Sequence, residues 1–420
     1  MPTQFHAPHG QHFECRDCAS RCCVMPWKVV ITEEEKQRFE AEAWIRERLA
    51  AHGVAIESVG EGLYRLPALV RNRRLECVFL DEDGLCSQVK RHDREFWSRT
   101  CKTFPFDFFE VAEGQVHVSL SQHCPAIRDN YGKPLGPQLE QYFSTFGGKA
   151  TRIAETMQLG GMTQLNRPQY LRVAQLWREQ IAAADSLPQG LLNSYDLTQA
   201  LAIALLDKTH PTAEEFNAAI DTVTREFTPE PIPPQKKSSL LARLLLSLHL
   251  SRRTYPIWSY LSKPDSSKIR CAYYAYRNTL RLLRGKGDID LILLPRAFEL
   301  SLSDGVDSAM ENPALADRAK HFFDDVLTRG NLFLRPRAMN QALLDLFLSL
   351  AILLRIARYR AAASGRRVPD MSDLGEGLSY AECIALYHVA RHPAPPVAEL
   401  IMSILADNRQ GLIGLATVEA

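Results

Sequence analysis

Cysteines are distributed very unevenly along this chain of 420 residues. Eight of the ten lie between Cys15 and Cys124, and only Cys271 and Cys383 follow. Lone cysteines buried in a core do not group in this way, and in a reducing compartment grouped cysteines indicate a metal site more often than disulfides. The distribution therefore predicts a cysteine-ligated metal centre in the first third of the chain. Cys271 and Cys383, each alone on an expected helix, are interpreted as ordinary buried thiols.

The rest of the sequence favours a cytoplasmic protein. Its start, MPTQFHAPHGQHFEC, shows no apolar run behind a basic stretch, so no secretory signal is expected. The most apolar window, 343–354, is too short to cross a bilayer and is interpreted as a core helix. With 50 basic and 49 acidic residues, the net charge of +1 gives no argument for nucleic-acid or membrane partners.

The first cysteine group has the spacing of a metal-binding turn. It runs CRDCASRCC from Cys15 through Cys18 to Cys22 and Cys23. Cysteines two or three residues apart can turn both sulfurs toward one iron or zinc centre. Adjacent cysteines point in different directions, so Cys22 and Cys23 serve two centres, or one of them is a packing residue.

Four further cysteines are single and widely spaced. Each lies beside an expected turn or strand end, where the backbone can bend around a ligand, and they are Cys77, Cys86, Cys101 and Cys124. A structural zinc site usually shows two paired knuckles, and here only the first pair is tight. This pattern favours an iron–sulfur cluster, with zinc as the alternative. Trp27, Phe104 and Phe106 are candidates for apolar cover over the centre.

The fold expected is mainly α: a small α+β cysteine-rich metal module followed by a multi-helix body without a large parallel sheet. Thr32 should cap a helix reaching about residue 51, and a hairpin is expected over 106–111 and 115–121. Three domains are expected: the metal or iron–sulfur module over 1–130, a helical domain over 131–230 and a second helical block over 231–420. The stretch 228–235, TPEPIPPQ, is the expected linker. Helices are expected over 89–99, 136–158, 168–185, 196–207, 213–227, 237–261, 267–284, 314–328, 337–361 and 379–391.

Five short stretches together resemble one known family. They are FECRDCASRCCVMPWKVVIT, CVFL, GLCSQV, RTCKTFPF and LSQHCP, all within the first 125 residues. This pattern is similar to the flagellin lysine N-methylase family and to the wider group of cysteine-rich zinc- or iron-chelating domains. The resemblance implies an iron–sulfur cluster, expected to be 4Fe–4S. It also implies S-adenosylmethionine as methyl donor and surface lysines of flagellin as substrate.

The resemblance also assigns individual cysteines. Cys18, Cys22 and Cys23 fall on the family's Cys-x-x-x-Cys-Cys. Its Cys-x-Phe-Leu…Cys unit corresponds to Cys77 and Cys86. Cys101 stands before the aromatic–proline pair, Cys124 is the final Cys-Pro cysteine, and Cys15 matches an earlier cysteine at a different spacing. After the proline, Phe106 stands where the family often has arginine.

Neither common scaffold for S-adenosylmethionine is visible. The doubly wound sheet needs a glycine-rich turn between a strand and a helix, and the candidates at 60–62, 285–287 and 375–377 are interpreted as loops. The radical-type motif Cys-x-x-x-Cys-x-x-Cys fits Cys18 and Cys22, but its third position is Met25. His92, His117 and His123 lie near the cysteines and are interpreted as surface or core residues rather than ligands.

Two hypotheses follow. The first is a protein-lysine N-methyltransferase with an N-terminal iron–sulfur cluster. The second is a non-enzymatic zinc- or iron-binding module whose helices bind a protein partner. The sequence leaves open which four cysteines ligate a cluster, where the donor binds and which group accepts the lysine proton.

Overall fold

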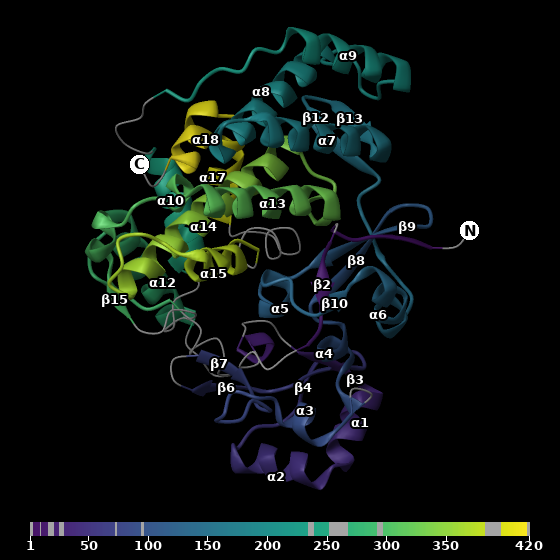
Figure 1. Ribbon diagram of the computed structural model, residues 1–420, viewed down its shortest axis with the longest axis vertical. Coiled ribbons are helices and arrows are strands. Elements are labelled where there is room, and N and C mark those ends of the chain that lie inside the picture. The colour runs from purple at the N-terminus through teal and green to yellow at the C-terminus, as the bar shows by residue number, and fades with distance from the viewer. Residues whose placement is uncertain are drawn as a thin grey trace.

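The computed structural model describes residues 3–8, 10–15, 21–24, 29–71, 74–93, 96–233, 239–251, 268–291, 297–382 and 396–417. Three parts follow one another along its long axis (Figure 1). A lower part carries most of the described cysteines, a middle part is built around a hairpin, and an upper body is helical. The chain begins in the middle part, descends, returns through the middle part and then enters the body.

The lower part combines small antiparallel sheets with short helices around its own core. One sheet has the order β3-β5-β4, and a hairpin is formed by β6 and β7. The core holds Ile31, Phe39, Ile45, Val78 and Phe79, each at most 1% exposed. The elements are β3 (Val30–Thr32), β4 (Glu57–Gly60), β5 (Leu63–Arg65), β6 (Ala68–Arg71) and β7 (Arg74–Cys77), with helices α1 (Glu33–Ala41) and α2 (Ala43–Ala51).

The helix expected after Thr32 begins where predicted but is broken once. Thr32 Oγ1 accepts from the Glu35 amide at 3.3 Å, and Glu35 Oε2 accepts from the Thr32 amide at 2.9 Å, which is a capping box. The backbone of Glu42 is extended and separates α1 from α2. Arg46 donates to the carbonyls of Glu40 and Ala41, so the end of α1 is satisfied without continuing the helix.

The prediction of a single helix over 89–99 is wrong. The structure has two single-turn helices instead, α3 (Ser87–Arg91) and α4 (Arg99–Thr103). The backbone of His92 is extended and ends α3, and its carbonyl accepts from the Trp97 indole at 3.3 Å. Side-chain contacts at His92 therefore override the local helical pattern.

The middle part contains the predicted hairpin. Strands β8 (Phe106–Ala112) and β9 (Gln115–Leu120) pair antiparallel around Gly114, whose φ of +72° suits a tight turn. The sheet order is β1-β9-β8-β11, with both outer strands parallel to their neighbours. The remaining elements here are β1 (Gln4–His6), β2 (His12–Phe13), β10 (Lys133–Pro134), β11 (Thr151–Arg152), α5 (Pro125–Arg128) and α6 (Leu139–Thr145).

The helix expected over 136–158 is replaced by a short helix and strands. Residues 156–160 form β12 (Thr156–Gly160), which pairs antiparallel with β13 (Thr163–Asn166). Met157, Leu159 and Leu165 are buried while their neighbours are more exposed, which is the period of a strand. The spacing of apolar residues before Gly160 is compatible with the period of a helix and with that of a strand. The hairpin turn decides in favour of the strand.

The upper body packs around α14 (Met339–Ala363), most of whose residues are buried. Its helical character agrees with the expected mainly α class. Within the described residues after 130, the strands are short and form no large parallel sheet. The other long elements are α7 (Arg167–Ala183), α8 (Leu187–Ala204), α9 (Ala213–Glu226), α10 (Leu240–Ser251), α12 (Lys268–Arg284), α13 (Pro313–Arg329), α15 (Met371–Ala381), α17 (Pro396–Ala406) and α18 (Arg409–Ala416).

Most expected helices of this body are present, with shifted ends. The predictions for α7, α9, α12, α13 and α14 agree with the structure, while α8 and α15 begin about eight to nine residues before the expected starts. Helices α17 and α18 were missed, and part of the expected helix over 237–261 lies outside the described residues. In the part of the chain that is described, no helix is both long and apolar enough to span a bilayer. The three-domain division stays a prediction.

One glycine pair expected in a loop lies within a helix. Gly375 and Gly377 are both buried on α15, which packs against α14. A Cβ at Gly377 would fall inside van der Waals contact of the Leu353 carbonyl. These glycines therefore allow two helices to approach closely and form no nucleotide-binding turn.

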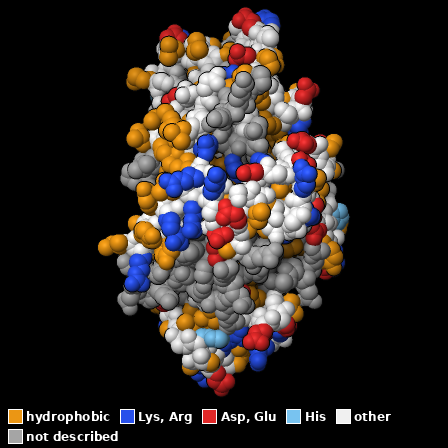
Figure 2. Space-filling model, turned by 90° about the vertical axis from the view of Figure 1, so that its left-hand side faces the viewer, with side chains coloured by type: hydrophobic (Ala, Val, Ile, Leu, Met, Phe, Trp, Pro, Cys, Tyr) orange, Lys and Arg blue, Asp and Glu red, His pale blue; other side chains and the backbone are white. Residues whose placement is uncertain are grey.

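The surface is less even than the net charge indicates. Figure 2 shows Lys and Arg side chains gathered on one face, with hydrophobic side chains beside them. On α12, Tyr273 and Tyr276 are 58% and 65% exposed, and Arg277 lies over the rings of Tyr273 and Tyr274. These two tyrosines therefore belong to the surface of the helical body.

Candidate metal centre

Five of the predicted ligand cysteines come together in the lower part. Hydrogen bonds link the Cys23 thiol to the sulfurs of Cys22, Cys77 and Cys86. The Cys101 thiol is close enough to interact electrostatically with Cys22, Cys77 and Cys86. Residues almost 80 positions apart in the sequence thus form one thiol group, which we call the five-thiol cluster.

The members of the cluster come from a 3-10 turn, a strand end, a helix N-cap and a short helix. Cys22 and Cys23 lie on a single 3-10 turn, and Cys77 is the last residue of β7. Cys86 is the N-cap of α3 and forms an isolated bridge with Leu80. Cys101 lies in α4, whose N-cap Ser98 accepts from the Cys101 amide at 3.2 Å. The expected position beside a turn or strand end is confirmed for Cys77 and Cys86, whereas Cys101 lies within a short helix.

The thiols differ in how easily they ionise. A hydrogen bond from Cys23 lowers the pKa of Cys86 to about 7, assisted by the Val89 and Gln88 amides at the start of α3. The same donor lowers the pKa of Cys22. These bonds hold the proton on Cys23 and raise its pKa well above the usual value. Burial raises the pKa of Cys101.

The cluster suits a thiophilic metal by its chemistry. Thiolates are the ligands that zinc and iron–sulfur clusters prefer, and five sulfurs are more than either requires. Among the described residues, however, no group of three or more His, Cys, Asp or Glu side chains has the arrangement of a finished metal shell. The sulfurs here share protons with one another, and a metal would replace those protons.

The other predicted ligands lie elsewhere or outside the described residues. Cys15 follows β2 and is exposed, and Cys124 is 7% exposed at the N-cap of α5 within the middle-part core. Cys18 lies outside the described residues. Ligation by all eight cysteines remains a prediction. Cys271 is half-buried on α12, and Cys383 is also outside the described residues.

The aromatic side chains that share a core with the cluster cysteines differ from the expected ones. Cys77 and Cys86 pack against the core of the lower part, together with Trp44 and Phe96. Phe106 is instead stacked on Tyr142 in the middle part, where Phe104 also packs. Trp27 lies outside the described residues. Trp44 and Phe96 were missed because only the folded chain brings α2 and residue 96 against the core that Cys77 and Cys86 also join.

The three candidate histidines are engaged by other groups. His92 Nε2 accepts from the Trp44 indole at 3.1 Å, and its ring stacks on Phe96 with centroids 3.8 Å apart. His117 Nδ1 is bonded to the Thr328 carbonyl, and His123 Nδ1 shares a 2.5 Å hydrogen bond with Ser379 Oγ. These contacts support the interpretation of the histidines as packing residues.

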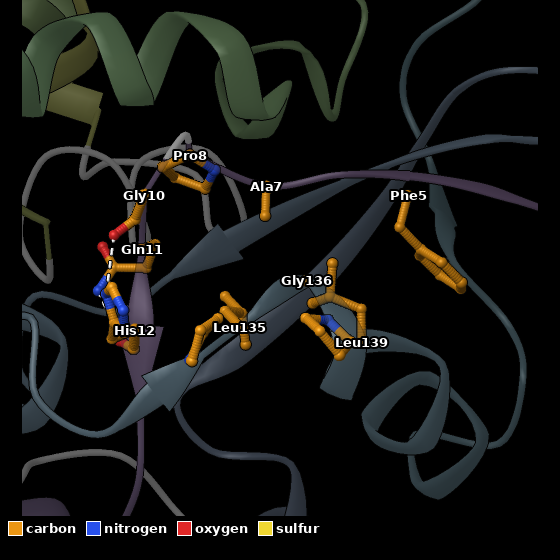
Figure 3. Close-up of a pocket in the computed structure, with 11 residues that line it drawn as sticks. Phe5, Ala7, Pro8, Gly10, Gln11, His12, Leu135, Gly136 and Leu139 are labelled. Atoms are coloured by element: carbon orange, nitrogen blue, oxygen red, sulfur yellow. Dashed lines mark hydrogen bonds between the residues drawn. The ribbon is translucent and has the colours of Figure 1, made fainter.

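A separate pocket of about 520 Å³ lies in the middle part (Figure 3). Its walls come from residues 5–8, 10–12 and 134–139, the last of which lead into α6, and they are largely apolar. Among the labelled side chains, His12 is held by a 2.9 Å hydrogen bond between its Nδ1 and the Gly10 carbonyl. The volume lies within the range of small-molecule sites, but few fixed polar groups are present to orient a ligand.

Comparisons with known proteins give limited similarity. No protein-family model matches the chain, and no solved structure matches it significantly. The chain is 29% identical over 122 residues to the flagellar biosynthetic protein FliU of Salmonella muenchen, covering 28% of this chain and 69% of that protein.

Two further relatives carry the name lysine-N-methylase. The one from Salmonella choleraesuis is 29% identical over 122 residues, and the one from Salmonella typhimurium is 28% identical over 114 residues. The matched regions span only 29% and 27% of those two proteins and 28% and 26% of this chain. The similarity therefore extends over less than a third of this chain and less than a third of each of these two lysine-N-methylases.

Proposed function

We propose that this protein is an S-adenosylmethionine-dependent protein-lysine N-methyltransferase that acts on flagellin in the cytoplasm. We further propose that the five-thiol cluster, with Cys18 as the resemblance implies, holds an iron–sulfur cluster, expected to be 4Fe–4S. The observation that carries the metal proposal is the gathering of Cys22, Cys23, Cys77, Cys86 and Cys101. The names of the partial relatives support the activity.

The chain's own residues have defined tasks in this proposal. Cys86 and Cys22 ionise most readily and would bind the metal first, and Cys23 would lose its shared proton. Trp44 and Phe96 would exclude water from the sulfurs. A bound iron–sulfur cluster would supply Lewis acidity and redox capacity, and would tie β7, α3 and α4 together.

Methyl transfer sets a separate requirement. The lysine nitrogen must be neutral to attack the methyl group of a sulfonium donor, because its lone pair forms the new bond. A group near the acceptor must therefore take the ammonium proton, or a dry pocket must lower the lysine pKa. The large body after residue 130 is the part available to grip a protein substrate.

The metal is tested by composition. We would purify the protein anaerobically and measure iron, acid-labile sulfide and zinc in wild type, Cys22→Ser, Cys101→Ser and the matched control Cys271→Ser. The expected result is brown protein that loses most iron and sulfide in the first two variants and none in the control. Unchanged metal in both cluster variants would show that these two cysteines are not ligands. Colourless protein with stoichiometric zinc would favour a non-enzymatic zinc module with a helical interaction body.

The activity is tested by label transfer. Wild type with intact metal should transfer a labelled methyl group from S-adenosylmethionine to lysines of cognate flagellin, and Cys22→Ser should not. Mass spectrometry of the flagellin would identify the modified lysines. If wild type with intact metal transfers no label, the enzyme proposal fails for this substrate and the metal-binding module becomes the better interpretation.

A further inference from the structure

A buried polar interface joins the segment 120–128 to the helical body. This segment leads from β9 through Cys124 into α5, and side chains of α13 and α15 bond to it, Arg318 to Gln122 and Ser379 to His123. Arg329 donates to the Leu120 carbonyl at 2.7 Å, and Arg128 pairs with Glu376 at 3.4 Å. These contacts connect residues about 210 to 250 positions apart, so sequence reasoning could not find them.

Gln122 is the centre of this interface and is 1% exposed. Its side-chain oxygen accepts from Arg318 at 2.9 Å, and its backbone amide donates to Glu382 Oε2 at 2.7 Å. Ser121 Oγ donates to the same Glu382 oxygen at 3.1 Å. Both bonds therefore fix one oxygen of the carboxylate, and Oε1 receives no hydrogen bond from the residues that the structure describes.

Glu382 forms no salt bridge with the residues that the structure describes. Arg128 is paired with Glu376, and Arg329 is paired with Asp325 at 2.5 Å. Glu382 is 8% exposed, and burial raises its pKa to about 7. The charge of Arg329 and the bonds from Gln122 and Ser121 oppose this rise, and Asp107 adds to it.

This combination has the properties of a proton acceptor. A general base works best when its pKa lies near the working pH and one of its oxygens can reach the proton. Glu382 has an oriented carboxylate, an oxygen without a described partner, and a position at the junction of the middle part with the body.

We propose that Glu382 accepts the ε-ammonium proton of the lysine that is methylated. This proposal rests on the function proposed above. In the step, an N–H bond of the ammonium breaks and an O–H bond forms at Oε1, which leaves a neutral amine and a neutral carboxyl. The amine lone pair then bonds the methyl carbon of the sulfonium donor. The carbon–sulfur electron pair stays on sulfur, which leaves as a thioether, and the carboxyl later returns its proton to water.

The test compares Glu382→Gln with the matched control Glu376→Gln. Both changes remove a buried carboxylate from the same interface, and the first keeps an oxygen that can accept from Gln122. We would measure kcat for labelled methyl transfer from pH 6 to 9, together with iron content, S-adenosylmethionine affinity and circular dichroism. Glu382→Gln should lower kcat about 100-fold with metal, affinity and fold unchanged. Glu376→Gln should retain kcat within about threefold.

The pH profile separates a proton acceptor from a structural contact. In wild type, kcat should rise with pH through an inflection near 7, as Glu382 ionises. Glu382→Gln should lose this inflection. Ser121→Ala keeps the carboxylate but removes one donor to it, so its inflection should move to higher pH, and this variant carries the test if Glu382→Gln does not fold.

The outcomes distinguish the two proposals. If wild type is active and Glu382→Gln keeps both kcat and the inflection, Glu382 is not the acceptor while the methyltransferase proposal stands. An unmoved inflection in Ser121→Ala also contradicts the assignment. If wild type with intact metal transfers no methyl group, the methyltransferase proposal fails, and this step fails with it.

Discussion

The Cys86 thiol ionises more readily than an ordinary cysteine. Its pKa of about 7 comes from the hydrogen bond of Cys23, while burial keeps the pKa of Cys101 high. Because the thiolate is the nucleophile, Cys86 in metal-free protein should react with iodoacetamide at pH 7.5 at least about 10-fold faster than Cys101. Peptide mass spectrometry over time measures both rates. Equal rates would mean that the thiols do not share protons as described.

Replacing Cys23 by alanine should remove this difference. Without the S–H donor, the pKa of Cys86 should rise toward that of an ordinary thiol, and its alkylation at pH 7.5 should slow. Cys271→Ala is the control, since Cys271 lies on α12 in the helical body. A Cys86 rate that is unchanged by the loss of Cys23 would assign its low pKa to the α3 amides instead.

Glu382 should also make stability depend on pH. Its pKa is raised in the folded protein, so the folded state binds the proton more tightly than the unfolded state. The resulting stabilisation is therefore present at low pH and is lost as the pH rises toward about 7. Relative to Glu382→Gln, wild type should lose on the order of 3 kcal/mol of unfolding free energy between pH 4.5 and 8. Urea unfolding at several pH values measures the difference, and parallel curves for the two proteins would contradict it.

At the level of elements, the close contact of α14 and α15 depends on glycine. Gly377→Ala would push a Cβ into the Leu353 carbonyl, whereas at Gly375 the nearest atom is the flexible end of Arg128, at 3.0 Å. Gly377→Ala should therefore lower the unfolding free energy by about 1–3 kcal/mol. Gly375→Ala should change it much less, because alanine favours the helix and Arg128 can move. Denaturant melts of both variants decide this, and similar midpoints would mean that the helices separate without cost.

Which elements the sequence could predict depends on the range of the forces that form them. Thr32 and Glu35 lie three residues apart, so the start of α1 could be predicted from the sequence. The hairpin at Gly114 was also set locally. The extended backbone of His92 was not, because contacts with distant residues, such as Trp44 on His92, override the local period. The hairpin at Gly160 is also local, but its apolar spacing fits a helix as well as a strand.

At the scale of the whole molecule, the range of the contacts again decides what the sequence can predict. The cysteine cluster was partly predictable, and the interface of Glu382 was not. Cysteine numbers in the first third were enough to predict a common centre, since few other roles explain such grouping. The sequence could not show that Cys23 would join Cys77 and Cys86, nor that Glu382 would reach Gln122. Those contacts depend on how the chain passes twice through the middle part before the body is built.

Arg329 provides the test of how strongly these parts are joined. It is 2% exposed, donates to the Leu120 carbonyl at the end of β9 and pairs with Asp325. Arg329→Met fills the space but leaves that carbonyl and that carboxylate without their cation. The unfolding free energy should therefore fall by about 3 kcal/mol, because breaking a buried pair costs far more than breaking an exposed one.

The matched control is Arg178→Met. It removes the ion-pair partner of Asp324, which lies on α13 as Arg329 does. The side chains of that pair are 31% and 49% exposed, so its loss should cost about 1 kcal/mol or less. Hydrogen exchange gives the second measurement. Arg329→Met should speed amide exchange over 116–128 while the amides of α1 and α2 keep wild-type rates, because the core of the lower part does not include this contact. Equal destabilisation by both variants, or uniform exchange along the chain, would mean that Arg329 does not join the middle part to the body.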